Sequence, residues 1–138
     1  MTLTGLPDGT QVITATMAWN GDPVASRQVT VTIDTTGPTA PTVTSPTPGS
    51  TLTTLPVTLT GTAEAGSVVQ VFHSDQMQYT EAVTSSAGTW SVVLDRGYFD
   101  YEGVLTGRRA TVSLTVWALD GVGNSSPTTT LTYTTRLR

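Results

Sequence analysis

Residues 105–135 read LTGRRATVSLTVWALDGVGNSSPTTTLTYTT, and this stretch decides the fold. An earlier stretch, residues 5–35, reads GLPDGTQVITATMAWNGDPVASRQVTVTIDT. In both, a segment with alternating apolar residues is followed by a loop that contains glycine, and then by a run in which threonine alternates with apolar residues. Alternation with period 2 is the pattern of a half-buried β-strand. Each stretch is therefore predicted to form a β-hairpin.

The two hairpin stretches lie about 100 residues apart, which is the length of one immunoglobulin-like β-sandwich. Threonine and valine are abundant between them, and β-branched residues favour strands over helices. We therefore expect an all-β chain in two parts. Residues 35–138 are predicted to form a complete immunoglobulin-like β-sandwich, and residues 1–34 to be the last two strands of a second, partial unit of this kind. The boundary segment at residues 34–41, DTTGPTAP, is expected to be extended and semi-rigid.

Five segments of the larger part predict both a strand and its inward face. The inward residues of the first three segments are, in order, Val57 and Leu59; Val69 and Val71; and Trp90, Val92 and Leu94. Those of the last two segments are Val112, Leu114, Val116 and Ala118; and Leu131 and Tyr133. A first strand is expected at an edge near Thr42–Ser45, because the prolines around it cannot donate hydrogen bonds to a central ladder. A further short strand is expected near Met77–Thr84, and Asp95–Gly107 is expected to be a longer connection.

The sequence leaves open how the N-terminal hairpin is covered. An isolated two-stranded hairpin is marginally stable in water, so its apolar face needs a partner surface. One register places Ile13, Ala15, Met17, Trp19, Val29, Val31 and Ile33 on that face, and a gap-free match to residues 112–118 instead turns Val12, Thr14, Thr16 and Ala18 inward. The missing strands could have been cut away with the rest of a domain, the hairpin could fold back on the larger part, or another copy could supply them.

Composition excludes several classes of function. The 138 residues carry a net charge of −4, whereas nucleic-acid binding needs clustered basic side chains. There is no cysteine, which excludes disulfides, thiol catalysis and cysteine-ligated zinc. There is no lysine, which excludes a lysine–asparagine isopeptide cross-link. No run of about 18 apolar residues is present, so no membrane span is predicted.

Several motifs together resemble the bacterial immunoglobulin-like repeats of large surface adhesins and biofilm-associated proteins. They are IDTTGPTAP at residues 33–41, GTAEAGSVV at residues 61–69, GTW at residues 88–90 and DGVGN at residues 120–124. The resemblance covers residues 29–135, and it departs from the family pattern in the long aromatic loop at residues 96–109 and in the WNGD segment at residues 19–22. It implies an extracellular module of a tandem-repeat protein at the bacterial cell surface, with a spacer or adhesion role and no enzymatic reaction.

The leading functional hypothesis is therefore a non-enzymatic module that acts as a structural spacer or adhesive stalk, with neighbouring immunoglobulin-like domains as its partners. In a second hypothesis the chain is a self-assembling filament subunit, whose N-terminal hairpin completes the sheet of a neighbouring copy. In a third it is a carbohydrate- or protein-binding module that contacts a host or matrix glycan or protein.

Calcium is one candidate ligand. In a sandwich of this kind the incoming linker, the loop between the second and third strands and the loop of the last hairpin lie at one end, and here they carry Asp34, Glu64, Asp120 and Asn124. Ca²⁺ takes about six to eight oxygen ligands, largely carboxylate and carbonyl. The alternative is that Asp120 and Asn124 bond to the backbone of their own loop, as such residues do in turns.

Aromatic residues form the second candidate site. Tyr98, Phe99 and Tyr101 share one loop, and Trp117 points away from the predicted core, so their rings could hold a sugar or a protein partner. The alternative is that Tyr98 and Phe99 close the open end of the sandwich and that Trp117 packs against a neighbouring segment. His73 stands at the end of a predicted strand and is therefore expected to be a surface residue. A catalytic histidine needs an aligned nucleophile, and no catalytic residue is predicted.

Overall fold

The computed structural model describes residues 2–73, 77–99 and 109–136. The chain divides into two compact units, Met1–Thr36 and Gly37–Arg138. Within the described residues, all regular structure is β-strand apart from α1 (Arg96–Phe99), a single helical turn. No helix in these ranges is long and apolar enough to cross a membrane.

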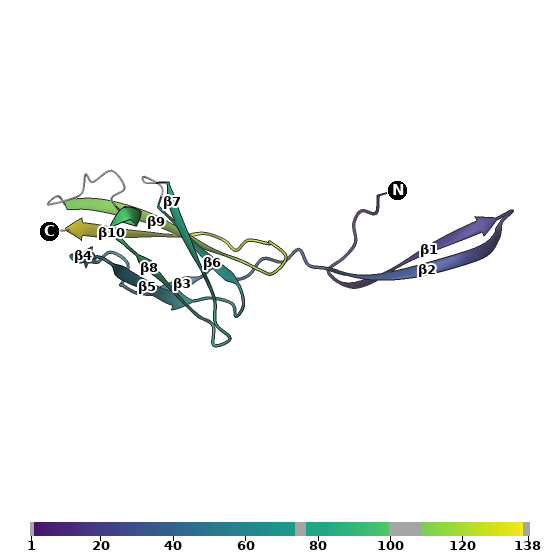
Figure 1. Ribbon diagram of the computed structural model, residues 1–138, viewed down its shortest axis with the longest axis horizontal. Helices are drawn as coiled ribbons and strands as arrows, with labels where there is room; N and C mark the ends of the chain where they lie inside the picture. The colour runs from purple at the N-terminus through teal and green to yellow at the C-terminus, as the bar shows by residue number, and fades with distance from the viewer. Residues whose placement is uncertain (1, 74–76, 100–108, 137–138) are drawn as a thin grey trace. The chain divides into compact units, whose positions relative to one another are not determined.

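The second unit is a sandwich of two sheets (Figure 1). Its strands are β3 (Thr42–Ser45), β4 (Thr51–Leu52), β5 (Val57–Thr62), β6 (Val68–His73), β7 (Gln78–Val83), β8 (Thr89–Leu94), β9 (Arg109–Leu119) and β10 (Thr129–Arg136). One sheet has the order β4-β10-β9-β6-β7 and the other the order β3-β5-β8. All paired neighbours are antiparallel except β4 and β10, which are parallel. The predicted all-β sandwich is therefore confirmed.

The core fills the space between the two sheets and confirms the inward faces that alternation predicted. Every inward residue predicted for the five strands is buried, apart from Val57, which is half-buried. Trp90 of β8, Leu114 of β9 and Tyr133 of β10 are among the buried residues. The expected edge strand is β3, and the expected short strand near Met77–Thr84 is β7. The alternating inward residues of the two sheets therefore pack against each other and form the core.

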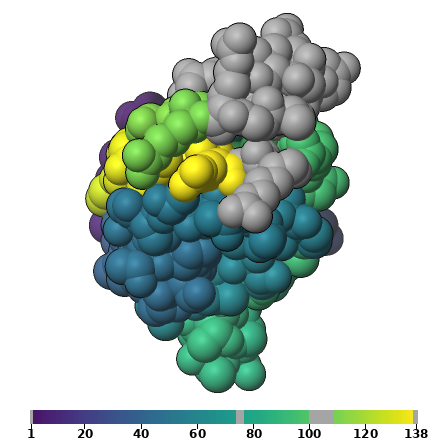
Figure 2. Space-filling view, turned by 90° about the vertical axis from the view of Figure 1, so that its left-hand side faces the viewer, coloured from purple at the N-terminus to yellow at the C-terminus, as the bar shows by residue number. Residues whose placement is uncertain are grey.

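The segment after β3 crosses to the five-stranded sheet, which the sequence did not predict. Thr51–Leu52 pairs with Thr134–Thr135 at the end of β10, and the Gly49 amide donates to the Thr132 carbonyl at 2.7 Å. The Tyr133 hydroxyl donates to the Pro46 carbonyl at 2.9 Å. Figure 2 looks onto this end of the sandwich, where residues around β4 pack against the end of β10. The first part of the unit is thus tied to its last strand.

The first unit is a long antiparallel hairpin of β1 (Gly9–Trp19) and β2 (Asp22–Ile33). Its loop is the dipeptide Asn20-Gly21, with φ of 51° and 90°. Two central residues with positive φ are the signature of a type I′ turn, which matches the twist of the flanking strands. The turn makes Trp19 and Asp22 the last cross-strand pair.

The observed register decides which hairpin residues share a face. Ile13 pairs with Val29, and Met17 pairs with Ala25, so these lie on one side. Val12 pairs with Thr30 and lies on the opposite, threonine-rich side. The pairing sets which residues of the two strands share a face, and which of the two faces is turned inward stays a prediction. The assignment of this hairpin to a second immunoglobulin-like unit stays a prediction.

Candidate functional site

Trp117 lies on the outer face of the five-stranded sheet, because its neighbours Val116 and Ala118 are buried and side chains alternate along β9. It pairs with Gln70 of β6, and Gln70 pairs with Glu81 of β7. The adjacent row across the same strands contains Phe72 and Tyr79. We call these five residues, Gln70, Phe72, Tyr79, Glu81 and Trp117, the outer aromatic face.

Polar contacts join the outer aromatic face. The Gln70 Nε2 donates to Glu81 Oε2 at 3.1 Å, and the Tyr79 hydroxyl donates to the same oxygen at 3.4 Å. Tyr79 is 58% exposed, whereas Phe72 and Trp117 are half-buried. Aromatic side chains on one face of a sheet with an amide and a carboxylate can stack on a ring-shaped ligand and hydrogen-bond its edge.

The sequence identified Trp117 in this surface but missed Phe72 and Tyr79. The outward direction of Phe72 could have been predicted from the sequence, because Phe72 follows directly after Val71, an inward residue of the same strand as Val69. A residue between two inward positions of a strand faces outward. Only the pairing of β6 with β7, which the sequence did not specify, brings Tyr79 beside it.

Two aromatic residues of the predicted patch lie in the core instead. Tyr98 is 7% exposed and Phe99 is fully buried. Their ring centroids are 5.6 Å apart in an edge-to-face arrangement, and the Tyr98 hydroxyl donates to the Val71 carbonyl at 2.9 Å. Burial raises the pKa of the Tyr98 hydroxyl. This placement does not support a contact of either ring with a partner, and Tyr101 lies outside the described residues.

His73 is buried, and the expectation that it lies at the surface is wrong. It is the last residue of β6, but it continues the inward face of Val69 and Val71. Its ring centroid lies 6.0 Å from that of Tyr98 and 6.1 Å from that of Phe99. The rings of Tyr98 and Phe99, both in α1, pack against this strand end, which is why the terminal position is not an exposed one.

Asp120 organises the loop between β9 and β10. Its Oδ1 accepts the amides of Val122 at 2.9 Å and Asn124 at 2.8 Å, and its Oδ2 accepts the Asn124 Nδ2 at 2.7 Å. Desolvation alone would raise the pKa of Asp120, but the hydrogen bonds from Asn124, Val122 and Gly123 outweigh it and lower that pKa. The structure brings Asp120 and Asn124 together as an Asx-type loop closure.

The other two residues of the predicted calcium site have separate surroundings. Glu64 lies in the turn between β5 and β6, where its carbonyl accepts both the amide and the hydroxyl of Ser67. Asp34 belongs to the first unit, and its Oδ1 accepts the Thr36 amide at 3.1 Å. Among the described residues there is no group of three or more histidine or acidic side chains that could hold a metal ion. Calcium binding stays a prediction without structural support.

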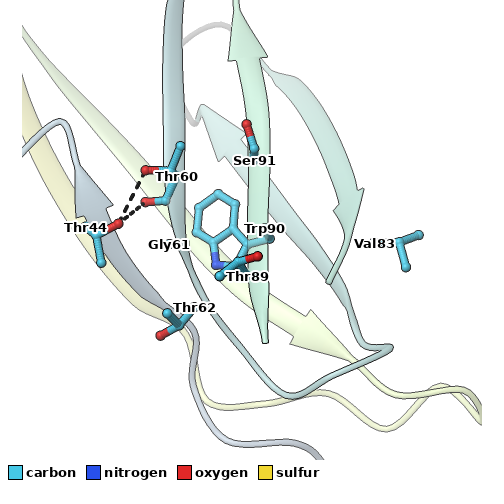
Figure 3. Close-up of a pocket in the computed structure, with 8 residues that line it drawn as sticks. All are labelled: Thr44, Thr60, Gly61, Thr62, Val83, Thr89, Trp90 and Ser91. Carbon is cyan, nitrogen blue, oxygen red and sulfur yellow. Dashed lines mark hydrogen bonds between the residues drawn. The ribbon is translucent and has the colours of Figure 1, made fainter. Parts of the chain in front are cut away.

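A shallow pocket of about 550 Å³ lies on the three-stranded sheet (Figure 3). Hydroxyl side chains of three strands line most of it: Thr44, Thr60, Thr62, Thr89 and Ser91. The Thr44 hydroxyl donates to the Thr60 carbonyl at 3.2 Å and lies 3.3 Å from the Thr60 hydroxyl. No charged residue lines the pocket, so it provides neither a general base nor a metal ligand.

Comparison with known proteins gives one match. A family model described as "Bacterial Ig domain" matches residues 37–135. This range covers most of the chain and coincides closely with the second structural unit, Gly37–Arg138. The comparison with curated proteins gives no match.

Proposed function

The chain belongs to the bacterial Ig domain family, and from that membership we propose that it is a non-enzymatic spacer in the stalk of an extracellular bacterial surface protein. The resemblance to bacterial immunoglobulin-like repeats is confirmed by the match, and such a domain fits a structural or adhesive module. The adhesive setting, the surface location and the neighbouring domains are part of the proposal. A spacer must keep its units folded under tension and must limit bending between them.

The connecting segment is the observation that carries this proposal. On the side of the first unit, Asp8 Oδ1 accepts the Thr35 amide at 3.2 Å and the Thr35 hydroxyl at 2.7 Å, and Asp8 Oδ2 accepts the Thr36 hydroxyl at 3.0 Å. These hydrogen bonds fasten the chain leaving β2 to the residues that precede β1.

On the side of the second unit the connection is also fastened. Pro38 and Pro41 are buried, and Gly37 packs so closely on Ser125 that an added Cβ would lie 2.8 Å from the Ser125 carbonyl carbon. The Thr129 hydroxyl donates to the Pro41 carbonyl at 3.3 Å. Few residues between the two fastened segments are left to rotate, which supports a stiff connection.

The strand order at the C-terminal end supports resistance to tension. β4 follows the N-terminal entry of the second unit, and β10 leads to its C-terminus. Because the two strands are parallel, pulling the ends of this unit apart slides one along the other. The hydrogen bonds of the two residue pairs are then loaded together and not one after another, so the unit resists unfolding until they break at once.

Single-molecule fluorescence transfer tests the stiffness of the connection. The chain has no cysteine, so Thr30→Cys in the first unit and Thr58→Cys in the second, both at exposed sites, give one dye position each. We expect a narrow distribution of transfer efficiencies that Asp8→Ala broadens. Asp22→Ala, which removes another carboxylate of the same unit, is the matched control and should leave the distribution unchanged. A distribution already as broad as that of a flexible linker would refute the stiff spacer.

The outer aromatic face supports a second candidate function, the binding of a glycan or a protein. The observation in its favour is that the exposed ring of Tyr79 and the half-buried ring of Trp117 share one face of the sheet with the hydrogen-bonded pair of Gln70 and Glu81. A glycan array probed with the intact chain tests it. Binding that is lost in both Trp117→Ala and Tyr79→Ala, but kept in Val93→Ala on the other sheet, would support this function. An array without signal would leave the spacer role as the better account.

A further inference from the structure

The two faces of the β1–β2 hairpin differ in chemistry. One face carries Ile13, Ala15, Met17, Trp19, Ala25, Val29, Val31 and Ile33, and the other is rich in threonine. Met17 is 64% exposed, Trp19 is 73% exposed and Val29 is 54% exposed. Within the described residues of the first unit, no further strand pairs with β1 or β2. An apolar face of this size needs an occupant.

A hollow of about 380 Å³ lies on this hairpin, toward its tip. Ala15 and Arg27 form one cross-strand pair beside it, and Met17 and Ala25 form another. The pair between them, Thr16 and Ser26, directs its side chains to the opposite face, so its backbone forms the floor. The small alanine side chains are what leave the hollow open.

The residue that fits this hollow stands beside it. Trp19 occupies the last pair before the Asn20-Gly21 turn, on the same face, and it is the sole aromatic residue in the sequence of the first unit. It lies three residues from the floor of the hollow, which is about 10 Å along the strand. Because side chains of a strand stand roughly perpendicular to the sheet, we expect Trp19 to leave the hollow of its own hairpin open.

We propose that two copies of this chain pair tip to tip, with Trp19 of each copy seated in the hollow of the other. A two-fold axis that lies between the two hairpins, across the strands and close to Met17, produces this arrangement. Such an axis places β1 over β1 and β2 over β2 of the two copies. It moves Trp19 of one copy over the segment between Ala15 and Met17 of the other.

The same axis brings opposite charges together, which is the independent argument for a second copy as the occupant. Asp22 pairs with Trp19, and Arg27 pairs with Ala15, so both charged residues lie on β2 and on the apolar face. The rotation that seats Trp19 therefore sets Asp22 of one copy near Arg27 of the other, twice in each pair. Arg27 is the only basic residue in the first 36 residues of the sequence. The face is thus complementary to itself in both shape and charge.

The pairing is expected to be weak. The overlap covers about six residues of each strand, or about 20 Å, which is much less than a stable protein interface provides. We expect dissociation constants between about 1 μM and 1 mM. The inference goes beyond the spacer role, because a spacer needs no contact between copies, and it gives the filament hypothesis a defined contact.

Sedimentation velocity of the intact chain across this concentration range tests the proposal. We expect a reversible monomer–dimer equilibrium that Trp19→Thr weakens at least tenfold. Val29→Thr, on the apolar face but away from the overlap, should change it little. Val12→Thr makes the same substitution at a similarly exposed site on the threonine-rich face, and it should also leave dimerisation unchanged. A chain that stays monomeric throughout would overturn the proposal, as would equal weakening by Trp19→Thr and Val12→Thr.

Charge reversal separates this geometry from unspecific association. Asp22→Arg places two arginines together at each contact, and Arg27→Asp places two carboxylates together, so each variant alone should dimerise at least several-fold more weakly. An equimolar mixture of the two variants restores an Arg–Asp pair at both contacts, and its affinity should return toward that of the unaltered chain. A mixture no stronger than the separate variants would contradict the two-fold pairing. Circular dichroism of each variant confirms that the hairpin is retained.

Discussion

Gly61 of β5 lies directly against the indole ring of its cross-strand partner, Trp90 of β8. A Cβ added to Gly61 would come within 2.7 Å of two ring carbons of Trp90 and would also meet the Thr42 carbonyl oxygen. The absence of a side chain at Gly61 is therefore what lets the largest residue of the core lie flat on the three-stranded sheet.

Gly61→Ala should destabilise the second unit by about 1–3 kcal/mol, because the indole or β3 must move to admit a methyl group. Urea unfolding followed by tryptophan fluorescence measures the change. Gly121→Ala is the control, because nothing lies within 4 Å of its added Cβ and its φ is not positive. Equal stability of Gly61→Ala and Gly121→Ala would show that the close packing is not as described.

Tyr98→Phe should cost about 1 kcal/mol of unfolding free energy, since it leaves the Val71 carbonyl without the hydroxyl that donates to it. Tyr98→Ala should cost more, about 3–5 kcal/mol, because it also empties part of the core. Chemical unfolding of both variants measures the two effects. If the aromatic loop were a surface feature, both substitutions would change stability by less than about 0.5 kcal/mol.

The loop closed by Asp120 should make stability depend on acidity. The pKa of Asp120 is lowered in the folded chain, so its hydrogen bonds stabilise the fold above the unfolded pKa of 3.8, and that stabilisation is lost as the pH falls through the lower, folded value. Asp120→Ala should melt at a lower temperature than the unaltered chain near neutral pH. The two melting temperatures should converge below the folded pKa. A difference that stayed constant into strong acid would exclude this role of the carboxylate.

Alkaline conditions should destabilise the sandwich through two buried tyrosines. Desolvation raises the pKa of Tyr98 and of Tyr133 above 10.0, the ordinary value of a tyrosine hydroxyl. The folded state then holds these protons more tightly than the unfolded state. This stabilisation is fully present below the unfolded pKa and is lost as the pH rises from there through the higher, folded pKa. The double variant Tyr98→Phe/Tyr133→Phe should lose less stability between about pH 9 and pH 11. A loss identical to that of the unaltered chain would assign the alkaline sensitivity to other groups.

Period-2 alternation made the larger part of the fold predictable. In Val112–Ala118, each inward residue is apolar and each residue between faces outward, so the strand and its buried face follow together. β4 could not be predicted in this way, because two residues are too few to show a period, and its pairing with β10 depends on contacts distant in sequence. The Asn20-Gly21 dipeptide did carry a hairpin signal that would have fixed the tip of the first unit.

The candidate site was less predictable, because it depends on which strands become neighbours. Trp117 could be placed outside the core from alternation alone. Tyr79 joins it only through the pairing of β7 with β6. Tyr98 and Phe99 looked like a surface patch because they lie in a connection between strands, but their rings pack against His73 at the end of β6. Alternation along a strand therefore predicts which face a side chain lies on, but it does not predict which other segments pack against that side chain.

Force spectroscopy on a polyprotein of linked copies tests the spacer account most directly. The account predicts that each copy of the second unit unfolds in one cooperative step, at a force well above that of a peeling hairpin, because β4 and β10 are sheared together. Its roughly 100 residues, Gly37–Arg136 in the described fold, should release about 33–36 nm of contour length before the folded span is subtracted. Unfolding in several small steps at low force would contradict the claim that this unit is built to carry tension.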